Sequence, residues 1–222
     1  MRRLIVPLLF GLVGAAVLAG LGVWQLQRLA WKDGVLADIS ARIAADPVPV
    51  PAAPDPAADR YLPVRFEGQL AGRPIHVLAS RKGLGAGYRV IAPLRGDGRT
   101  LMADLGFIPT DAADRPLPMG PLSVTGNLHW PDEVDGFTPA PDLDANIWFG
   151  RDVAAMAAAL GAEPVLIVAR RVAPGAGTEP VPVGVEGIPN NHLGYAVQWF
   201  GLALVWLGMT LYLLWRIRRR MA

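Results

Sequence analysis

The chain has 222 residues and a mass of 23.7 kDa, which is room for one ordinary domain with appendages. Charged residues make up 18% of it, against about a quarter in soluble domains, and the mean hydropathy is +0.32. These values exclude disorder as the main state and indicate membrane-embedded segments. There is no cysteine, which excludes disulfide scaffolds, thiolate zinc sites, thiol redox motifs, thiol-based copper chaperones and cysteine nucleophiles.

A charge-free run near the start of the chain, LIVPLLFGLVGAAVLAGLGVWQL, covers residues 4–26. As a helix it would rise about 35 Å, enough to cross a hydrocarbon layer of about 30 Å. A signal peptide is the alternative, since Val17-Leu18-Ala19 would pass as a cleavage site. We expect an uncleaved anchor, because the run is long for a signal peptide and continues into an amphipathic pattern.

A second apolar run covers residues 192–215 and is predicted to be the other membrane helix. Basic residues flank the two runs on their outer sides, whereas all 19 acidic residues lie between Asp33 and Glu186. The positive-inside rule then places both termini in the cytoplasm and the middle of the chain outside. Arg28 and Lys32 disagree with this orientation, and Asp33 offsets them in part. We interpret the basic C-terminal tail as a topology signal and expect no nucleic-acid partner.

The middle of the chain changes character twice. The first helix is expected to continue as an amphipathic extension that ends at Asp46-Pro47, where a proline-rich connector begins. From residue 61 the apolar period becomes two, and Gly96-Asp97-Gly98 between apolar runs predicts a hairpin. Asp152 and Gly161 are expected to cap and stop one helix. The unbroken apolar start of residues 164–172 predicts a strand buried on both faces.

The predicted fold class is therefore α+β: two transmembrane helices flank one small, mostly antiparallel extracytoplasmic β domain with one or two helices. In chain order the expected segments are a cytoplasmic N-terminus (1–3), membrane helix (4–26), amphipathic extension (27–46), connector (47–60), α+β domain (61–172), Gly/Pro-rich connector (173–191), membrane helix (192–215) and basic cytoplasmic tail (216–222).

The sequence offers little for catalysis. Its three histidines are His76, His129 and His192, and it contains no serine-hydrolase, zinc-protease or phosphate-loop motif. The glycines of residues 83–87 fail the dinucleotide spacing and predict a hairpin loop. His76 and His129 fit ordinary strand positions, so an enzyme is not expected.

The start of the second membrane helix is different. His192 follows Asn190-Asn191, which suit a helix cap. His192, Tyr195 and Trp199 would share one helix face. A helix N-terminus disfavours a protonated imidazole, which leaves a nitrogen lone pair for a metal.

The first membrane helix presents Trp24, Arg28 and Trp31 on one face at its outer end. If the two helices are neighbours, a porphyrin would suit the shared site: His192 would ligate the iron, the rings would cover the macrocycle, and Arg28 would meet a propionate. The alternative is an aromatic belt, because Trp and Tyr collect at bilayer interfaces whatever the function.

Two motifs resemble the signatures of the Surfeit-locus-one family of cytochrome c oxidase assembly factors. LGVWQLQRLAWK at residues 21–32 is similar to its LGxWQxxRxxWK, and NNHLGYAVQWF at residues 190–200 is similar to its NxHxxYAxxWF. Between them, residues 87–94 resemble a G-x-V-x-x-PL strand, and Trp148 with Arg151-Asp152 resembles the opening of a late helix. The sequence departs from the family at Leu105-Gly106-Phe107, where an RGW-like motif is usual, so this chain lacks the arginine of that motif and any partner contact it makes. Gln198 also replaces a small hydroxyl residue.

The resemblance implies a non-catalytic assembly factor in the cell inner membrane, or in the mitochondrial inner membrane of a eukaryote. It implies transient binding of haem a at the outer membrane boundary, and help in inserting it into, or retaining it in, subunit I of a haem-copper oxidase. Partners implied are subunit I, membrane lipid and, as a further candidate, haem a synthase. Carried over, His192 is the candidate axial ligand to haem iron, with the other cofactor-binding candidates at Trp24, Arg28, Trp31, Tyr195 and Trp199. The alternative is a haem-independent scaffold for a subunit I assembly intermediate.

Overall fold

The computed structural model describes residues 2–221 and divides into two compact units. One unit comprises the chain up to Asp38 and from Val185 on, and the other comprises Ile39–Gly184. The predicted fold class is confirmed: two long apolar terminal helices flank a mixed, mostly antiparallel sheet of eight strands with short helices.

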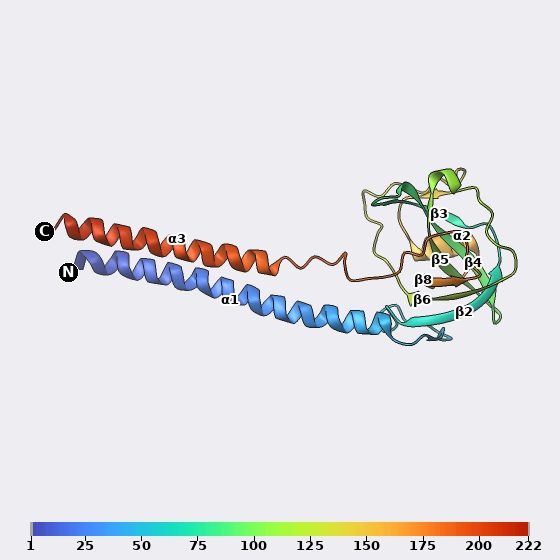
Figure 1. The fold of residues 1–222 in the computed structure, drawn as a ribbon, viewed down its shortest axis with the longest axis horizontal. Helices are drawn as coiled ribbons and strands as arrows, with labels where there is room; N and C mark the ends of the chain where they lie inside the picture. The colour runs from blue at the N-terminus through green and yellow to red at the C-terminus, as the bar shows by residue number, and fades with distance from the viewer. Residues whose placement is uncertain (1, 222) are drawn as a thin grey trace. The chain divides into compact units, whose positions relative to one another are not determined.

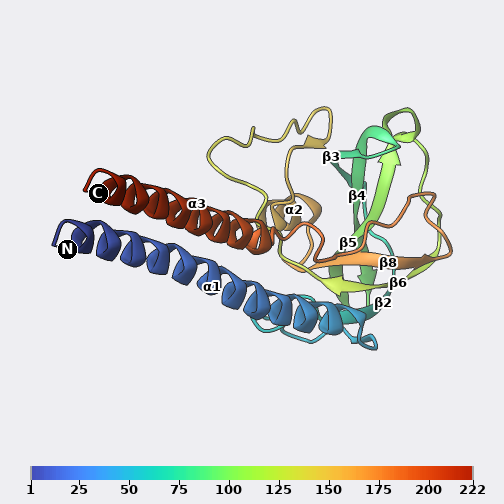
Figure 2. The same ribbon diagram turned by 60° about the vertical axis from the view of Figure 1, so that its left-hand side comes forward.

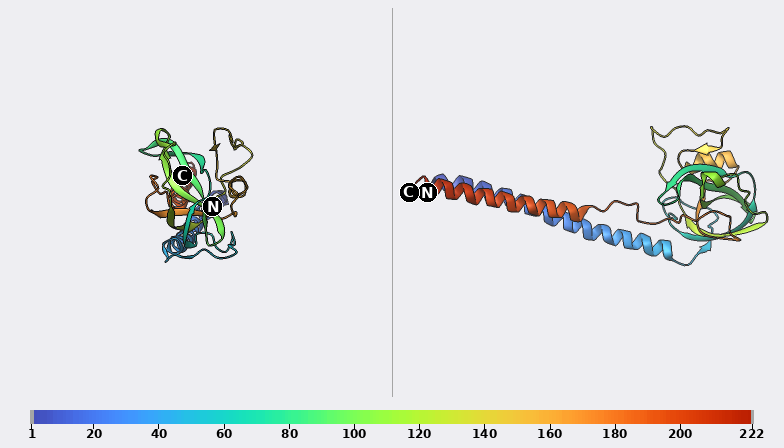
Figure 3. Two further views of the ribbon diagram at one scale, coloured as in Figure 1. Left: turned by 90° about the vertical axis from the view of Figure 1, so that its right-hand side faces the viewer. Right: turned by 45° about the horizontal axis from the view of Figure 1, so that its top comes forward.

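The terminal helices are α1 (Arg2–Ala44) and α3 (His192–Arg219). At 1.5 Å per residue the 43 residues of α1 extend about 65 Å, about twice a hydrocarbon layer, so much of its C-terminal half would lie beyond a membrane. Both helices are long and apolar enough to span a bilayer. They lie side by side and antiparallel, with the start of α1 beside the end of α3 (Figures 1 and 3).

Glycines on one face of α1 allow α3 to approach closely. A Cβ atom added at Gly14 would lie 2.3 Å from the indole Nε1 of Trp206, so only glycine leaves room for that ring. Side chains of α3 fill the same space at two other glycines: Gly11 faces Thr210, and Gly22 faces Phe200. The Trp206 indole also donates a 3.0 Å hydrogen bond to the Gly11 carbonyl. Small residues at such contacts are the usual means by which membrane helices pack.

The second unit is built around a closed sheet (Figure 2). Strands β2, β6, β8, β5 and β4 pair in that order, and β4 pairs again with β2, which closes a five-stranded barrel. β3 and β7 extend the sheet beyond β4, and β1 lies beside β2. Closure leaves few unpaired strand edges. The bounds are β1 Val48–Pro49, β2 Pro63–Leu70, β3 Ile75–Arg81, β4 Gly85–Gly96, β5 Arg99–Pro109, β6 Pro121–Leu128, β7 Ile147–Trp148 and β8 Leu166–Ala173.

The predicted hairpin joins β4 to β5. Gly96 pairs with Arg99, and the two residues between them, Asp97 and Gly98, have φ values of 50° and 74°. Positive φ at both central residues is the tight hairpin turn that matches the twist of antiparallel strands, and Asp-Gly is a preferred pair for it.

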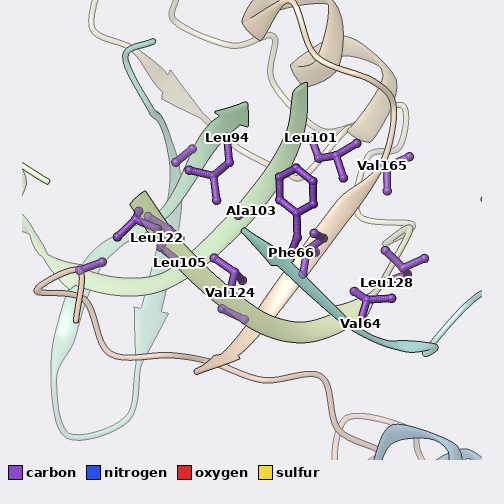
Figure 4. Close-up of a cluster of buried hydrophobic side chains, with 14 residues drawn as sticks. Val64, Phe66, Leu94, Leu101, Ala103, Leu105, Leu122, Val124, Leu128 and Val165 are labelled. Atoms are coloured by element: carbon purple, nitrogen blue, oxygen red, sulfur yellow. The ribbon is translucent and has the colours of Figure 1, made fainter. Parts of the chain in front are cut away.

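Two hydrophobic clusters lie on opposite faces of the barrel wall. The inner cluster includes Phe66, Leu94, Leu101 and Leu128 (Figure 4). The outer cluster packs the sheet against the helix α2 (Val153–Leu160) through residues such as Met156. β8 contributes to both clusters, since Leu166, Ile167, Val168 and Ala169 are all buried. This confirms the predicted strand with two buried faces.

The ends of α2 are the ones predicted from the sequence. The Asp152 carboxylate accepts a 3.0 Å hydrogen bond from the amide of Ala155, and Gly161 ends the helix in the left-handed conformation. A single 3₁₀ turn, η1 (Thr110–Ala112), follows β5.

Substitution of Gly106 tests how tightly the barrel packs on the segment that leads back toward α3. Gly106 has φ +116°, and a Cβ there would lie 2.2 Å from the Glu179 carbonyl oxygen. We expect Gly106→Ala to lower the free energy of unfolding by more than about 2 kcal/mol, because both backbone strain and a backbone clash are introduced.

Gly98→Ala is the matched control, since Gly98 also has a positive φ but open space around it; it should cost only about 1 kcal/mol. Denaturant unfolding of the full chain in detergent, followed by near-UV circular dichroism, measures both. Equal losses would contradict the packing described here.

Candidate functional site

His192, the first residue of α3, contacts α1 through its side chain. Its Nδ1 lies 2.8 Å from the Oε1 atom of Gln25. Gln25 is 9% exposed and therefore points toward α3. Because an amide oxygen only accepts hydrogen bonds, this contact is a hydrogen bond when Nδ1 carries the proton, and a neutral imidazole in that tautomer has its lone pair on Nε2.

The chain entering α3 is also held to α1. Lys32 donates a hydrogen bond to the carbonyl of Pro189, and Asn190 Nδ2 donates to Asp33 Oδ1 over 2.8 Å. The expected cap is thus corrected in one detail: Asn191 occupies the N-cap position, but its side chain makes no capping hydrogen bond, and Asn190 binds α1 instead.

The predicted residues on α1 lie to one side of this contact. Successive residues on a helix are about 100° apart, so Trp24 cannot share the direction of Gln25. Trp24 and Trp31 are 50% and 56% exposed, and the Arg28 guanidinium stacks 4.4 Å from the centre of the Trp31 ring. These three side chains form a cationic and aromatic surface on α1.

On α3, Tyr195 is 51% exposed and Trp199 is partly buried. Of the predicted site residues, His192 is thus the one for which the structure records a hydrogen bond to the other helix. The sequence analysis missed Gln25 as its partner. The sequence did contain a signal for Gln25: it lies three residues after Gly22, on the helix face that packs against α3.

An apolar groove of about 540 Å³ also lies between α1 and α3. It is lined by residues such as Gly14, Val17, Leu202 and Trp206. Leu202 is ten residues beyond His192, about 15 Å along the helix, so the groove lies deeper along the helix pair than the imidazole and is where acyl chains would pack.

A buried ion network occupies the barrel unit. Asp104 is completely buried and accepts hydrogen bonds from Arg89 Nε over 2.7 Å and from Arg151 over 3.2 Å. Arg151 also pairs with Glu133. Burial is the largest single influence and opposes the charges of Arg151 and Glu133. Their mutual hydrogen bonds and the attraction of the opposite charges around them, Asp104 included, together outweigh it, so the pKa of the arginine is raised and the pKa of the glutamate is lowered. The network joins β4, β5 and the segments before α2, and its charges are compensated.

His129 lies beside this network. Burial, aided by Arg151 and Arg60, lowers its pKa to about 4, so the imidazole is neutral at physiological pH. It stacks on Tyr61 with ring centres 5.5 Å apart. His76 is half-buried and stacks on Tyr88, and burial with Arg73 lowers its pKa as well. His76 lies in β3 as predicted, whereas His129 directly follows the end of β6 at Leu128, so its predicted strand position was wrong by one residue. Within residues 2–221 no three His, Asp or Glu side chains gather at metal-binding spacing.

Comparison with known proteins identifies the family. The family model described as "SURF1 family" matches residues 12–204. The chain belongs to the SURF1 family. This family is known for cytochrome c oxidase assembly factors, which confirms the resemblance seen in the two membrane-helix signatures.

Individual relatives agree. The chain is similar to Surfeit locus protein 1 of Mus musculus, with 28% identity over 86% of this chain and 70% of the mouse protein. It is 30% identical to Surfeit locus protein 1 of Homo sapiens over 81% of this chain and 68% of the human protein. A SURF1-like protein of Drosophila melanogaster is 28% identical over 86% of this chain and 71% of the fly protein.

The structure also accounts for a departure from the SURF1 pattern. Leu105, at the position of the usual arginine, is completely buried in the inner core cluster. Gly106 beside it has a backbone role, since the strand there exchanges hydrogen bonds of 2.7 and 2.8 Å between Phe107 and Glu179. The Leu105 side chain therefore belongs to the core in this chain.

The lowered pKa of His129 predicts a pH dependence of stability. Between the ordinary pKa of 6.5 and the folded value of about 4, the unfolded chain binds a proton that the folded protein does not. Stability should therefore fall as the pH falls through this window. We expect His129→Gln to reduce this acid-induced loss of stability by about 1–2 kcal/mol. The figure is smaller than the full pKa shift of His129 would give, because the ring is partly exposed.

Unfolding of the full chain at pH 7 and pH 4 measures the effect. His76→Gln is measured alongside, because the lowered pKa of His76 contributes to the pH dependence in the same direction. Identical pH dependence in the His129→Gln variant and the unmodified chain would show that His129 is not the group responsible.

Proposed function

We propose that this protein is a membrane-anchored assembly factor for a haem-copper terminal oxidase. In this proposal it binds haem a transiently at the outer membrane boundary and assists its insertion into, or retention in, subunit I. Membership of the SURF1 family supports the assembly role. The observation that supports haem binding is the His192 imidazole, whose Nδ1 is engaged by Gln25, so that Nε2 carries the lone pair.

The donor set fits a porphyrin. An imidazole with one nitrogen hydrogen-bonded is the usual form of an axial ligand. Arg28 supplies a cation for a propionate, and its contact with the Trp31 ring holds the guanidinium at the surface. Trp24, Tyr195 and Trp199 supply further rings near the same depth. Haem a is cargo here, and the chain contributes a ligand, a counter-charge and apolar cover.

The orientation follows from charge. Arg2, Arg3 and the arginines that follow residue 215 lie at the same end of the helix pair, which we assign to the cytoplasm. This assignment places the barrel unit and His192 on the outer side, in the periplasm for the cell inner membrane or in the intermembrane space for a mitochondrion. Candidate partners are subunit I, haem a synthase and membrane lipid.

A second function is favoured by one observation. Trp24, Trp31 and Tyr195 are about half exposed, as residues of an aromatic belt would be. The protein would then act as a haem-independent scaffold that holds a subunit I intermediate. Neither function requires catalysis.

His192→Ala separates the two functions. When the protein is purified in detergent from cells that make haem a, we expect the variant to lose most of its haem, because the axial ligand is removed. Optical spectra of the reduced protein measure this. His76→Ala, which removes the partly buried histidine of the sheet, is the control and should leave the haem content unchanged.

A His192→Ala variant that keeps its full haem complement while still co-purifying with subunit I would contradict the carrier function and favour the scaffold.

A further inference from the structure

We infer that Gln25 is a positioning residue that fixes the tautomer and direction of the His192 imidazole. This inference rests on the proposed function, because it concerns the side chain assigned there as the haem ligand. Gln25 Oε1 lies 2.8 Å from His192 Nδ1.

The first step of the argument is the position of Gln25 on α1. It follows Gly22 by three residues and is 9% exposed, so it lies on the face that packs against α3. Gln27, two residues further on, is exposed. A polar amide that is buried between two helices is costly unless it is hydrogen-bonded, and the imidazole supplies its partner.

The second step is the chemistry of the pair. A neutral imidazole carries its proton on either nitrogen, and a neighbouring acceptor decides which. The amide oxygen of Gln25 selects the Nδ1–H form. The lone pair then resides on Nε2, the nitrogen farther from the main chain and directed away from Gln25.

The third step is the rigidity of the surroundings. Lys32 binds the Pro189 carbonyl and Asp33 accepts from Asn190, so the chain two and three residues before His192 is tied to α1. With the main chain that enters α3 held to α1, the hydrogen bond to Gln25 restricts rotation of the ring. The imidazole is therefore oriented before any ligand arrives.

The fourth step is the neutrality of the acceptor. A carboxylate at this position would draw the Nδ1 proton more strongly and make Nε2 a stronger donor to a metal. The amide selects the same tautomer without that increase. A moderate donor suits a protein that must release its cargo to another subunit.

The tautomer can be measured without haem. The full chain, ¹⁵N-labelled at histidine and held in nanodiscs, contains only three histidines, so His76→Gln and His129→Gln backgrounds assign the signals. We expect His192 to be protonated at Nδ1 and unprotonated at Nε2. Gln25→Met, which keeps the side-chain length but removes the acceptor, should populate the Nε2–H form. The control Gln27→Met makes the same chemical change at an exposed site and should leave the tautomer unchanged.

Titration with haem a gives the second readout. Gln25→Met should weaken binding about 10–100-fold, the usual effect of removing the partner of a ligating histidine, and Gln27→Met should not. Gln25→Glu restores an acceptor, so it should rescue binding and raise the iron–histidine stretching frequency seen by resonance Raman spectroscopy. If Gln25 only supported helix packing, Gln25→Met would not change the tautomer of His192, and Gln25→Glu would not raise the iron–histidine frequency.

The inference is overturned if His192 in the unmodified chain is protonated at Nε2, or if Gln25→Met binds haem a as tightly as Gln27→Met. These results are distinct from failure of the proposed function, in which His192→Ala itself would keep its haem. If His192→Ala loses haem and Gln25→Met does not, His192 remains the proposed haem ligand and the positioning role of Gln25 is contradicted.

Discussion

The contact between the glycine face of α1 and the bulky side chains of α3 determines where the polar groups at the membrane boundary lie. Gly11, Gly14 and Gly22 leave space that Thr210, Trp206 and Phe200 fill. In a bilayer there is no hydrophobic driving force between apolar helices, so close packing and interhelical hydrogen bonds supply the attraction. The Trp206 indole adds such a bond to the Gly11 carbonyl. With the helices in this register, Gln25 meets His192, and Lys32 and Asp33 meet the chain just before it.

The barrel unit is stabilised differently. Its sheet closes through two residue pairs between β2 and β4, and β5 and β8 carry apolar side chains into a cluster on each face. Asp104 places a carboxylate in this wall and is compensated by Arg89 and Arg151. Removing one partner of such a buried group would leave an unpaired charge, which is far more costly than the pair is worth. The barrel unit therefore holds compensated buried charges, whereas the helix pair holds the ligand candidate His192.

Much of this architecture could be predicted from the sequence because its signals are local. The charge-free runs, the Asp97-Gly98 turn and the Asp152 cap each depend on a few adjacent residues, and each appears in the structure. Closure of the barrel could not be predicted in the same way. It depends on pairing between β2 and β4 and between β5 and β8, which are distant in the chain, and no local pattern specifies such partners.

The candidate site shows the same division. His192 stood out because a helix begins there and the motif contains it. Its partner Gln25 was not predicted, because the spacing of Trp24, Arg28 and Trp31 indicated another face of α1, which is exposed in the structure. Only the packing of α3 on the glycines shows that the neighbouring face, with Gln25, is the one that meets the imidazole.

The pairing of the two helices can be tested directly by disulfide cross-linking, because the chain contains no cysteine of its own. Cysteines introduced at Gly22 and Phe200 should cross-link under mild oxidation in native membranes, since Gly22 directly faces the Phe200 ring. Cysteines at Val23 and Phe200 should not, because Val23 lies on an exposed face of α1. Efficient cross-linking of the first pair alone is the result we predict. Equal cross-linking of both pairs, or none of the first, would contradict the helix register on which the account depends.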